Sequence, residues 1–262
     1  MAARAMWKGV VQFADVRLPV KMYAAVEDRD IHFRLLHEAD AQPVVQRMVH
    51  PSSGKVVPPD EVLRGIETDD GALRIVEEEE LERLRPEPSR DIEITRFVPR
   101  QAIPEGWYDR PYYLGPDGDP TGYFALAAAL QERARAGVAR WTMRGKRYVG
   151  ALTPEAGYLT LPTLRFAGEV VASEELGAPS GRELSRRELE MAEQLVSMLE
   201  DDFQPEAFRN RHRDRLRELI EAKARGEVVP LRPRRRRKPT EDLSAALKRS
   251  LERAKAEKRR AS

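Results

Sequence analysis

Two clusters of basic side chains hold the residues of this sequence that are best suited to a chemical task, the binding of phosphate groups. The denser cluster is an uninterrupted basic run close to the end of the chain: Arg234, Arg235, Arg236, Arg237 and Lys238. The second cluster places Arg144, Lys146 and Arg147 around Gly145. A Lys or Arg that meets a phosphate releases a condensed counterion, so clusters of this density predict a polyanionic ligand such as nucleic acid.

The charge of the chain is unevenly distributed along its length. Over all 262 residues, 46 Lys and Arg stand against 44 Asp and Glu. The last 31 residues contain 13 Lys and Arg but four acids, a net charge of +9; residues 1–231 carry 33 basic and 40 acidic residues, a net charge of −7. An acidic body of this kind binds nucleic acid only through a local basic surface. The alternative, a solvated tail that serves solubility or targeting, stays open on charge alone.

The residue patterns of common enzymes and metal sites are missing from the sequence. It has no cysteine, which excludes disulfides, thiolate zinc sites and cysteine nucleophiles. It has neither a Gly-rich phosphate loop nor a Gly-x-Ser-x-Gly nucleophile elbow. Residues 117–119 resemble the start of a calcium loop, but the twelfth position is Ala128, which offers no carboxylate. The histidines are scattered without the spacing of a zinc helix: His32, His37, His50 and His212. We therefore expect a binding protein that is not an enzyme and holds no metal or cofactor.

The hydropathy of the chain predicts no membrane span. No stretch approaches the roughly 20 apolar residues that a span needs. The first residues are not followed by the apolar segment of a secretory signal. We expect a cytoplasmic protein, associated with the nucleoid through its basic clusters.

Short β-forming stretches dominate the first 166 residues. Strands are expected at residues 10–13, 18–23, 31–36, 91–98, 138–143, 147–152, 157–161 and 164–166. The second basic cluster joins two of these strands, which places it at a hairpin turn. Another hairpin, residues 44–57, is predicted around the turn signal of residues 51–54. Many short strands with few long helices indicate a barrel or a sandwich.

Two helices are expected within this strand-rich part of the chain. The first covers residues 77–84 and is strongly acidic. The second covers residues 123–136, with Thr121 able to cap its start and Gly137 its end.

A change in composition near residue 172 marks the start of a helical region. Ser185 and Glu188 have the spacing of a capping box, and apolar residues follow on one helical face. Pro205 is expected to open another helix, which Gly226 can close. A proline-containing linker then leads to a final amphipathic helix over residues 240–260, which should be marginal without a partner.

Several segments, taken in their order along the chain, carry a family resemblance. They are residues 7–9, 18–23, 31–37, 70–71, 93–98, 112–116, 123–133, 139–146, 201–205 and 219–223. In this order they resemble the prokaryotic Ku proteins, and the resemblance runs collinearly over residues 4 to about 228. One departure is visible: many bacterial relatives have two cysteines in the turn where this chain has residues 48–54, so no metal clip is available here.

The resemblance implies an α+β fold in three parts. Residues 1–172 would form a strand-rich β-barrel with an inserted bridge of about residues 38–90, residues 173–229 a C-terminal helical arm, and residues 230–262 a basic, flexible tail. It implies a homodimeric ring that binds double-stranded DNA ends without sequence preference in non-homologous end joining. The ring would recruit and stimulate an ATP-dependent end-joining DNA ligase of the ligase D type, through residues 180–226 or through the tail.

The resemblance also ranks the basic residues as contacts to DNA. The best candidates for the inner wall of the ring are Arg47 and Lys55 in the hairpin of residues 44–57, together with the turn of residues 144–147. Lys8 and Arg34 are weaker candidates, because each is basic within a strand-like segment. Every one of them can instead be an ordinary exposed cation. Two rival functions stay open: a basic-tailed architectural DNA- or RNA-binding protein without end specificity, and a nucleic-acid repair enzyme.

Overall fold

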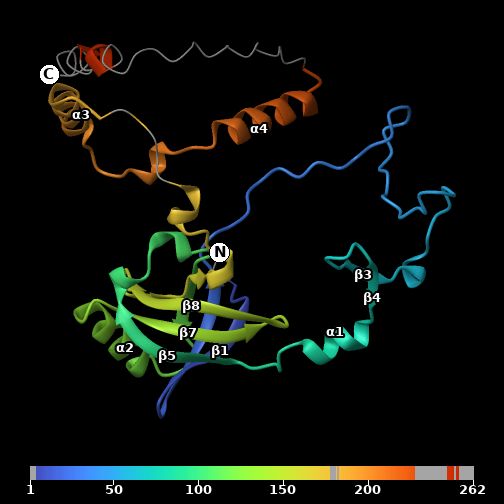
Figure 1. The fold of residues 1–262 in the computed structure, drawn as a ribbon, viewed down its shortest axis with the longest axis horizontal. Coiled ribbons are helices and arrows are strands. Elements are labelled where there is room, and N and C mark those ends of the chain that lie inside the picture. Colours follow the sequence, from blue (N-terminus) through green and yellow to red (C-terminus); the bar gives the residue numbers. More distant parts are fainter. Residues whose placement is uncertain (1–3, 178–180, 182, 228–246, 251, 254–262) are drawn as a thin grey trace. The chain divides into compact units, whose positions relative to one another are not determined.

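The computed structural model describes residues 4–177, 181, 183–227, 247–250 and 252–253. The chain separates into two compact units, Met1–Glu175 and Leu176–Ser262, which are described here one at a time (Figure 1). All the strands in the described part of the chain lie in the first unit, and the second unit is helical.

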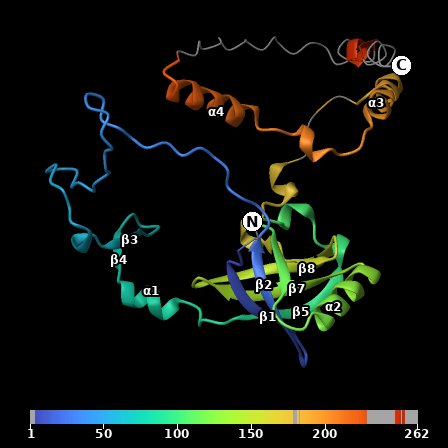
Figure 2. The same cartoon turned by 180° about the vertical axis from the view of Figure 1, so that it is seen from behind.

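The first unit is built on a closed β-barrel (Figures 1 and 2). Its strands are β1 (Trp7–Phe13), β2 (Val16–Ala24), β5 (Asp91–Pro99), β6 (Tyr112–Pro116), β7 (Arg135–Met143), β8 (Lys146–Glu155), β9 (Tyr158–Thr160) and β10 (Thr163–Leu164). They lie in the order β10-β8-β7-β5-β1-β2-β6-β9, and β9 pairs a second time with β8. That second pairing closes a seven-stranded ring, with β10 attached to β8 outside it. The predicted α+β fold with a β-barrel is confirmed.

One parallel strand pair breaks the antiparallel pattern of the barrel. β1 and β2 are antiparallel neighbours, whereas β1 and β5 run parallel, with Val10 opposite Asp91. Parallel neighbours cannot be joined by a tight turn. The chain between the end of β2 and the start of β5, residues 25–90, is called the insertion below.

The insertion contains little regular structure. It holds a short 3-10 helix, η1 (Pro59–Glu61), a two-stranded sheet of β3 (Arg64–Glu67) and β4 (Leu73–Val76), and α1 (Glu78–Leu84). The helix over residues 77–84 is therefore confirmed. The strand predicted at residues 31–36 is wrong: only Leu36 pairs, through an isolated bridge to Pro43. Alternation alone does not make a strand, and Phe33 and Leu35 stay 69% and 61% exposed, with no neighbouring strand in this chain.

The predicted hairpin of residues 44–57 forms as a turn with few ladder bonds. Val49 and Val56 pair across it, and the N–H of Val57 donates to the carbonyl of Met48 at 2.9 Å. The N–H of His50 donates to Lys55 O at 2.8 Å, and Gly54 takes the φ of +66° that the turn requires. Turn chemistry alone thus shapes this hairpin within the chain.

The interior of the barrel is one apolar cluster. Alternate residues of every long strand point into it, among them Val11, Met22, Ile92, Leu114 and Leu152, all fully buried. The helix α2 (Thr121–Glu132) contributes Tyr123, Leu126, Ala127 and Leu130 to the same cluster. Burial of these side chains is the main favourable term in the stability of the barrel.

The end of α2 differs from the sequence-based expectation. The helix stops at Glu132, four residues before the predicted end, and Ala134, with a φ of +47°, turns the chain. Gly137 does not cap the helix, because it lies in β7 opposite Phe97. The alanine-rich sequence favours continued helix, but pairing of residues 135–137 with β5 outweighs that propensity.

Helices dominate the second unit. In α3 (Arg186–Leu199) the predicted capping box is present, because Glu188 N–H donates to Ser185 Oγ (3.4 Å) and Ser185 N–H to Glu188 Oε2 (3.0 Å). Pro205 opens only a 3-10 turn, η6 (Pro205–Ala207), instead of the predicted helix.

The second long helix of this unit, α4 (Arg211–Ala224), begins after Asn210, whose Oδ1 accepts from Arg213 N–H at 3.1 Å. Of the final helix expected over residues 240–260, residues 247–250 and 252–253 are helical; the rest lies outside the described residues.

Two short 3-10 turns, η4 (Ala167–Glu169) and η5 (Ser173–Leu176), follow β10, while η2 (Arg100–Ala102) and η3 (Glu105–Trp107) lie between β5 and β6.

The hydroxyl of Tyr123 connects α2 to the seam where the barrel closes. It donates to Leu114 O at 2.6 Å and accepts from Leu159 N–H at 2.7 Å. Leu114 and Leu159 are cross-strand partners in the β6–β9 pair. The side chain is 1% exposed, and this burial raises the pKa of Tyr123.

Replacing Tyr123 by Phe should destabilise the barrel, because it leaves a buried N–H and a buried carbonyl without this partner. We expect the free energy of unfolding to fall by about 1–3 kcal/mol in urea denaturation. The control, Tyr158→Phe, removes a hydroxyl from an exposed side chain of β9, the strand that contains Leu159. It should change the free energy of unfolding by less than about 0.5 kcal/mol. Equal effects of the two substitutions would show that the hydrogen bonds of Tyr123 at this seam do not stabilise the barrel.

Candidate nucleic-acid interface

The turn between β7 and β8 presents three cations at one tip of the barrel. Met143 and Lys146 form its closing pair, and Arg144 and Gly145 between them both have positive φ, +52° and +71°. A two-residue turn with this conformation matches the right-handed twist of the strands and holds them in tight register. Arg144, Lys146 and Arg147 are exposed, and within the described part of the chain none of them forms a salt bridge. The turn therefore offers uncompensated positive charge.

The turn lies at the same end of the barrel as both roots of the insertion. β2 ends beside the start of β1, since Met22 pairs with Trp7, and β5 begins opposite Val10. β7 runs antiparallel to β5, so the last residues of β7 lie near Ser89 and Arg90, which come just before β5. A pocket of about 400 Å³ confirms this proximity, because Ser89 and Arg90 line it together with Arg144 and Gly145. The cations thus stand where the insertion leaves the barrel.

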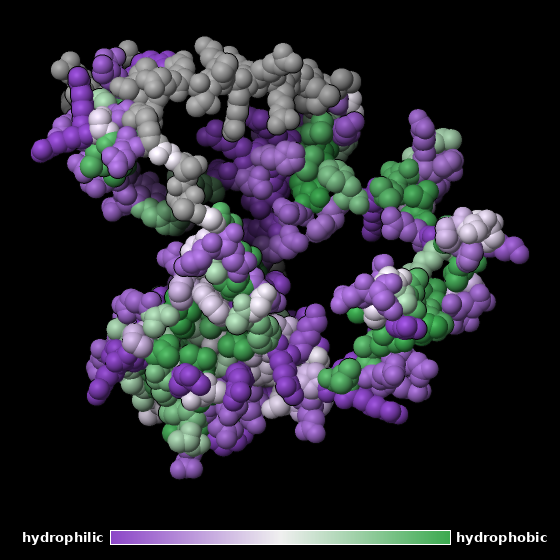
Figure 3. Space-filling view, in the orientation of Figure 1, coloured by the Kyte–Doolittle hydropathy of each residue, from purple (hydrophilic) through white to green (hydrophobic). Residues whose placement is uncertain are grey.

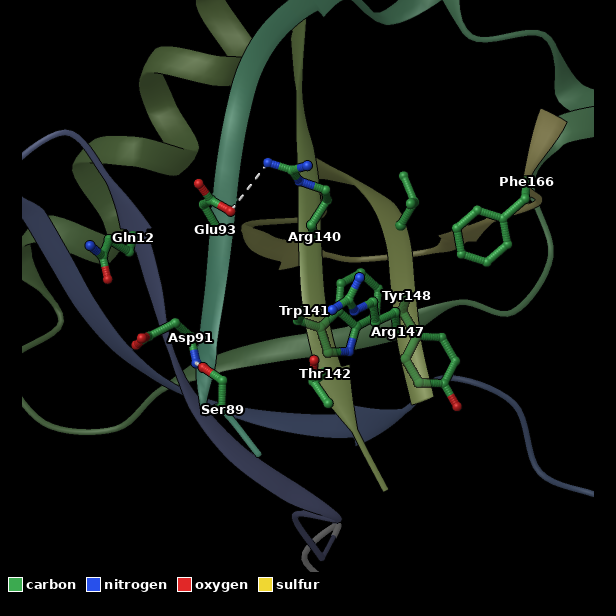
Figure 4. Close-up of a pocket in the computed structure, with 11 residues that line it drawn as sticks. Gln12, Ser89, Asp91, Glu93, Arg140, Trp141, Thr142, Arg147, Tyr148 and Phe166 are labelled. Carbon is green, nitrogen blue, oxygen red and sulfur yellow. Dashed lines mark hydrogen bonds and ion pairs between the residues drawn. The ribbon is translucent and has the colours of Figure 1, made fainter. Parts of the chain in front are cut away.

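A wider hollow opens on the outer face of the barrel next to the turn (Figure 4). It has a volume of about 660 Å³, and β1, β5, β7 and β8 all contribute to it. Its charged side chains are Asp91, Glu93, Arg140 and Arg147, and Gln12 and Thr142 add uncharged polar groups. Arg147 belongs both to the turn and to the hollow. The two features therefore form one continuous polar surface, which is called the barrel face below.

Both acids of the barrel face are paired with arginines. Arg140 Nη2 lies 3.4 Å from Glu93 Oε2, the contact drawn as a dashed line in Figure 4. Arg17 Nη2 lies 3.1 Å from Asp91 Oδ1, while its Nη1 donates to Gln12 Oε1 at 2.7 Å. With both carboxylates neutralised in this way, Arg147 and the turn cations set the sign of the surface.

The candidate Lys8 is held in a triad on another part of the barrel. Lys8 and Lys21 are cross-strand partners, and their Nζ atoms lie 2.9 and 2.8 Å from the two carboxylate oxygens of Asp117. Hydrogen bonding by Lys21, and then by Lys8, holds the pKa of Asp117 below its usual value, and the same bond raises the pKa of Lys21. Part of the charge of Lys8 is therefore already matched within the chain.

The remaining candidates are spread over the chain. Arg47 and Lys55 share the exposed hairpin of the insertion, and Arg34 lies in its irregular part. The five basic residues of the tail, 234–238, lie outside the described residues. Sequence reasoning missed three cations: Arg90 lies beside the turn, Arg140 lines the hollow, and Arg17 pairs with Asp91 of the hollow. Strand alternation could have found Arg140, because it has the outward parity of β7; its partner Glu93 follows only from the strand register.

In the described part of the chain, no cluster of three or more His, Cys, Asp or Glu is arranged to hold a metal ion. No helix among those same residues is long and apolar enough to cross a membrane.

Comparison with known proteins agrees with this architecture. The family model described as the Ku70/Ku80 beta-barrel domain matches residues 12–191. A "Non-homologous end joining protein Ku 2" of Geotalea uraniireducens is 40% identical over 253 residues, covering 96% of this chain and 98% of the relative. The "Non-homologous end joining protein Ku" of Heliobacterium modesticaldum is 34% identical, with coverages of 99% and 95%, and that of Archaeoglobus fulgidus is 34% identical, with coverages of 86% and 90%. The closed barrel, its insertion and these similarities together show that the chain belongs to the Ku family of non-homologous end joining proteins.

Proposed function

We propose that this protein binds the ends of double-stranded DNA without sequence preference and acts in non-homologous end joining. The observation that carries the proposal is the barrel face: Arg144, Lys146 and Arg147 stand without salt bridges among the described residues, on a rigid hairpin beside the roots of the insertion. Family membership supplies the process, since the relatives are named for non-homologous end joining.

The residues of the barrel face suit the recognition of the DNA backbone. Contacts of Lys and Arg to phosphates position a protein on DNA but carry no sequence information. The indole of Trp141 is not available for base stacking, because it is 4% exposed and stacks on Tyr148 within the core cluster. The turn cations would therefore bind DNA without preference for sequence. Specificity for ends then follows from topology, because a closed ring can be threaded only from an end.

We further propose that two copies form the ring, as a symmetric homodimer. The insertion exposes a row of apolar side chains, for which Figure 3 shows the hydropathy of the visible face. They include Phe33, Leu35, Val45, Met48, Leu63, Ile66, Leu73 and Ile75. Exposed apolar side chains in this number on one segment indicate a protein interface. A two-fold axis would pack one insertion against its copy, so that the exposed apolar side chains of both insertions become buried.

The protein would hold the DNA without altering it and would leave the joining reaction to a ligase. The helical second unit, with α3 and α4, offers exposed apolar side chains for such a partner, including Val196, Leu199, Phe203 and Phe208. The rings of Phe203 and Phe208 stack at 5.3 Å between centroids, which forms a ready hydrophobic anchor. We propose an ATP-dependent end-joining ligase of the ligase D type as the partner, docked on this unit or on the basic tail.

Reversing the charge of the turn tests the barrel face directly. The combined variant Arg144→Glu, Lys146→Glu and Arg147→Glu should lose DNA-end affinity by more than about a hundredfold, because three phosphate contacts become repulsive. Gel-shift titration with a short linear duplex measures the loss. The matched control is Arg96→Glu, Arg100→Glu and Arg135→Glu, the same charge change on exposed residues toward the opposite end of the β5–β7 pair. An equal loss in the control would mean that net charge, and not this turn, governs binding.

Polar substitutions in the insertion should weaken the dimer. Val45→Asp with Leu73→Asp places two charges on side chains that are 76% and 77% exposed in the single chain and buried in the proposed dimer. Sedimentation velocity at micromolar concentration should then show monomer. Gln46→Asp with Ser52→Asp, at exposed polar positions of the same insertion, should leave the dimer intact. A wild-type monomer that binds ends with full affinity would contradict the ring.

The third test separates a ring from a basic-tailed architectural protein and defines the role of the tail. A chain that ends at Val229 should still prefer linear over closed circular duplex, because threading depends on the barrel and the insertion. It should lose contacts with internal or bridging DNA, and stimulation of the ligase shows whether the partner docks on the tail. Equal affinity of the full chain for linear and circular DNA would favour the architectural protein. Complete loss of end binding on truncation would make the tail the main binding element.

A further inference from the structure

The two acids of the barrel face are unexpected on a surface that meets phosphates. Asp91 and Glu93 have the same outward parity on β5, beside the turn cations, and both line the hollow. A surface built only for tight binding would carry neutral or basic residues there, because carboxylates repel the DNA backbone. Each acid instead pairs with an arginine of another strand: Glu93 with Arg140 on the neighbouring strand β7, and Asp91 with Arg17 on β2, one strand further away across β1.

We infer that Asp91 and Glu93 are positioning residues that limit how tightly the barrel face holds DNA. Each carboxylate orients one guanidinium along the barrel wall and competes with phosphate for it. The inference rests on the proposed function, since it assumes that phosphates reach this surface.

The strength of the pairs suits such competition. Arg140 and Glu93 are 62% and 61% exposed, and their closest atoms are 3.4 Å apart. Exposed ion pairs of this kind are weak, so a phosphate can displace the carboxylate and be displaced in turn. A guanidinium that exchanges between a carboxylate and a phosphate loses little binding free energy when it leaves either of them. The protein could then move along the duplex without a deep energy minimum at each phosphate.

The two classes of cation on this surface have different tasks in this arrangement. Arg144, Lys146 and Arg147 have no carboxylate partner among the described residues and provide the affinity. Arg17 pairs with Asp91 and Arg140 with Glu93, so these two arginines are less available to phosphate. The number of cations free to bind phosphate, and with it the salt dependence, is lower than the number present.

Neutralising the carboxylates should therefore tighten binding. In the full chain, Asp91→Asn with Glu93→Gln frees two arginines, and one added phosphate contact is worth on the order of fivefold at 0.15 M salt. We expect affinity for a linear duplex to rise by roughly ten- to thirtyfold. The slope of log affinity against log salt should steepen by up to about 0.9 for each arginine freed. Movement along the duplex, followed by single-molecule fluorescence, should slow.

Three controls separate this effect from charge and from fold. Glu132→Gln removes a charge at the end of α2, none of whose residues line the hollow, and should leave the slope unchanged. Glu93→Asp keeps the carboxylate and should behave like the wild type. In an Arg140→Ala background, Glu93→Gln should lose most of its effect, because the arginine through which it acts is gone. Thermal unfolding of each variant confirms that the barrel is intact.

The outcomes distinguish this inference from the function on which it rests. If the wild type prefers linear DNA and the turn variant fails to bind, but the carboxylate variant keeps the wild-type affinity and salt slope, then the inference is wrong and the proposed function stands. Weaker binding by a folded carboxylate variant also overturns it. If the turn variant binds like the wild type, the barrel face does not meet DNA and both fail.

Discussion

Closure of the barrel depends on the short strand β9, which holds three residues and pairs with both β6 and β8. A strand so short supplies few ladder bonds, and the buried hydroxyl of Tyr123 adds one bond to each side of the β6–β9 seam. The side chains that β9 and the following residue send inward, Leu159 and Leu161, are fully buried. With the ring closed, the interior forms one apolar cluster and the barrel offers no free edge at this seam. The outer face can then be polar, because burial of the interior side chains, and not of the outer face, stabilises the fold.

The parallel pair β1–β5 is the second constraint, because it fixes where the insertion leaves the barrel. It requires the chain to leave and re-enter the barrel at the same end, which is also the end where the β7–β8 turn lies. A long excursion is possible there because its ends are fixed by the barrel and its length costs little in loop closure. The insertion lacks a core of its own, so its many exposed apolar side chains are the natural consequence. Topology thus places the insertion and the turn cations at one end of the barrel.

Much of the barrel could be predicted from sequence, because its strands alternate and its turns use characteristic residues. The turn at Gly145 and the capping box at Ser185 both follow from local chemistry, and both are found. Failures occurred where tertiary pairing decides. The helix α2 ends early because β7 pairs with β5, and residues 31–36 are not a strand because only an isolated bridge, Leu36 to Pro43, forms there among the described residues. Local patterns carry no information about such partners.

The candidate site shows the same division. Its free cations were visible in sequence, since Arg144, Lys146 and Arg147 flank a turn glycine, but Arg17 and Arg140 acquire their meaning only through the register of β5 against its neighbours. The same register explains how a chain whose first 231 residues carry a net charge of −7 can meet a polyanion. Net charge describes the far field, which salt screens within about 10 Å. At contact distance only the local arrangement counts: on the barrel face each acid is matched by an arginine, and the turn cations have no carboxylate partner among the described residues.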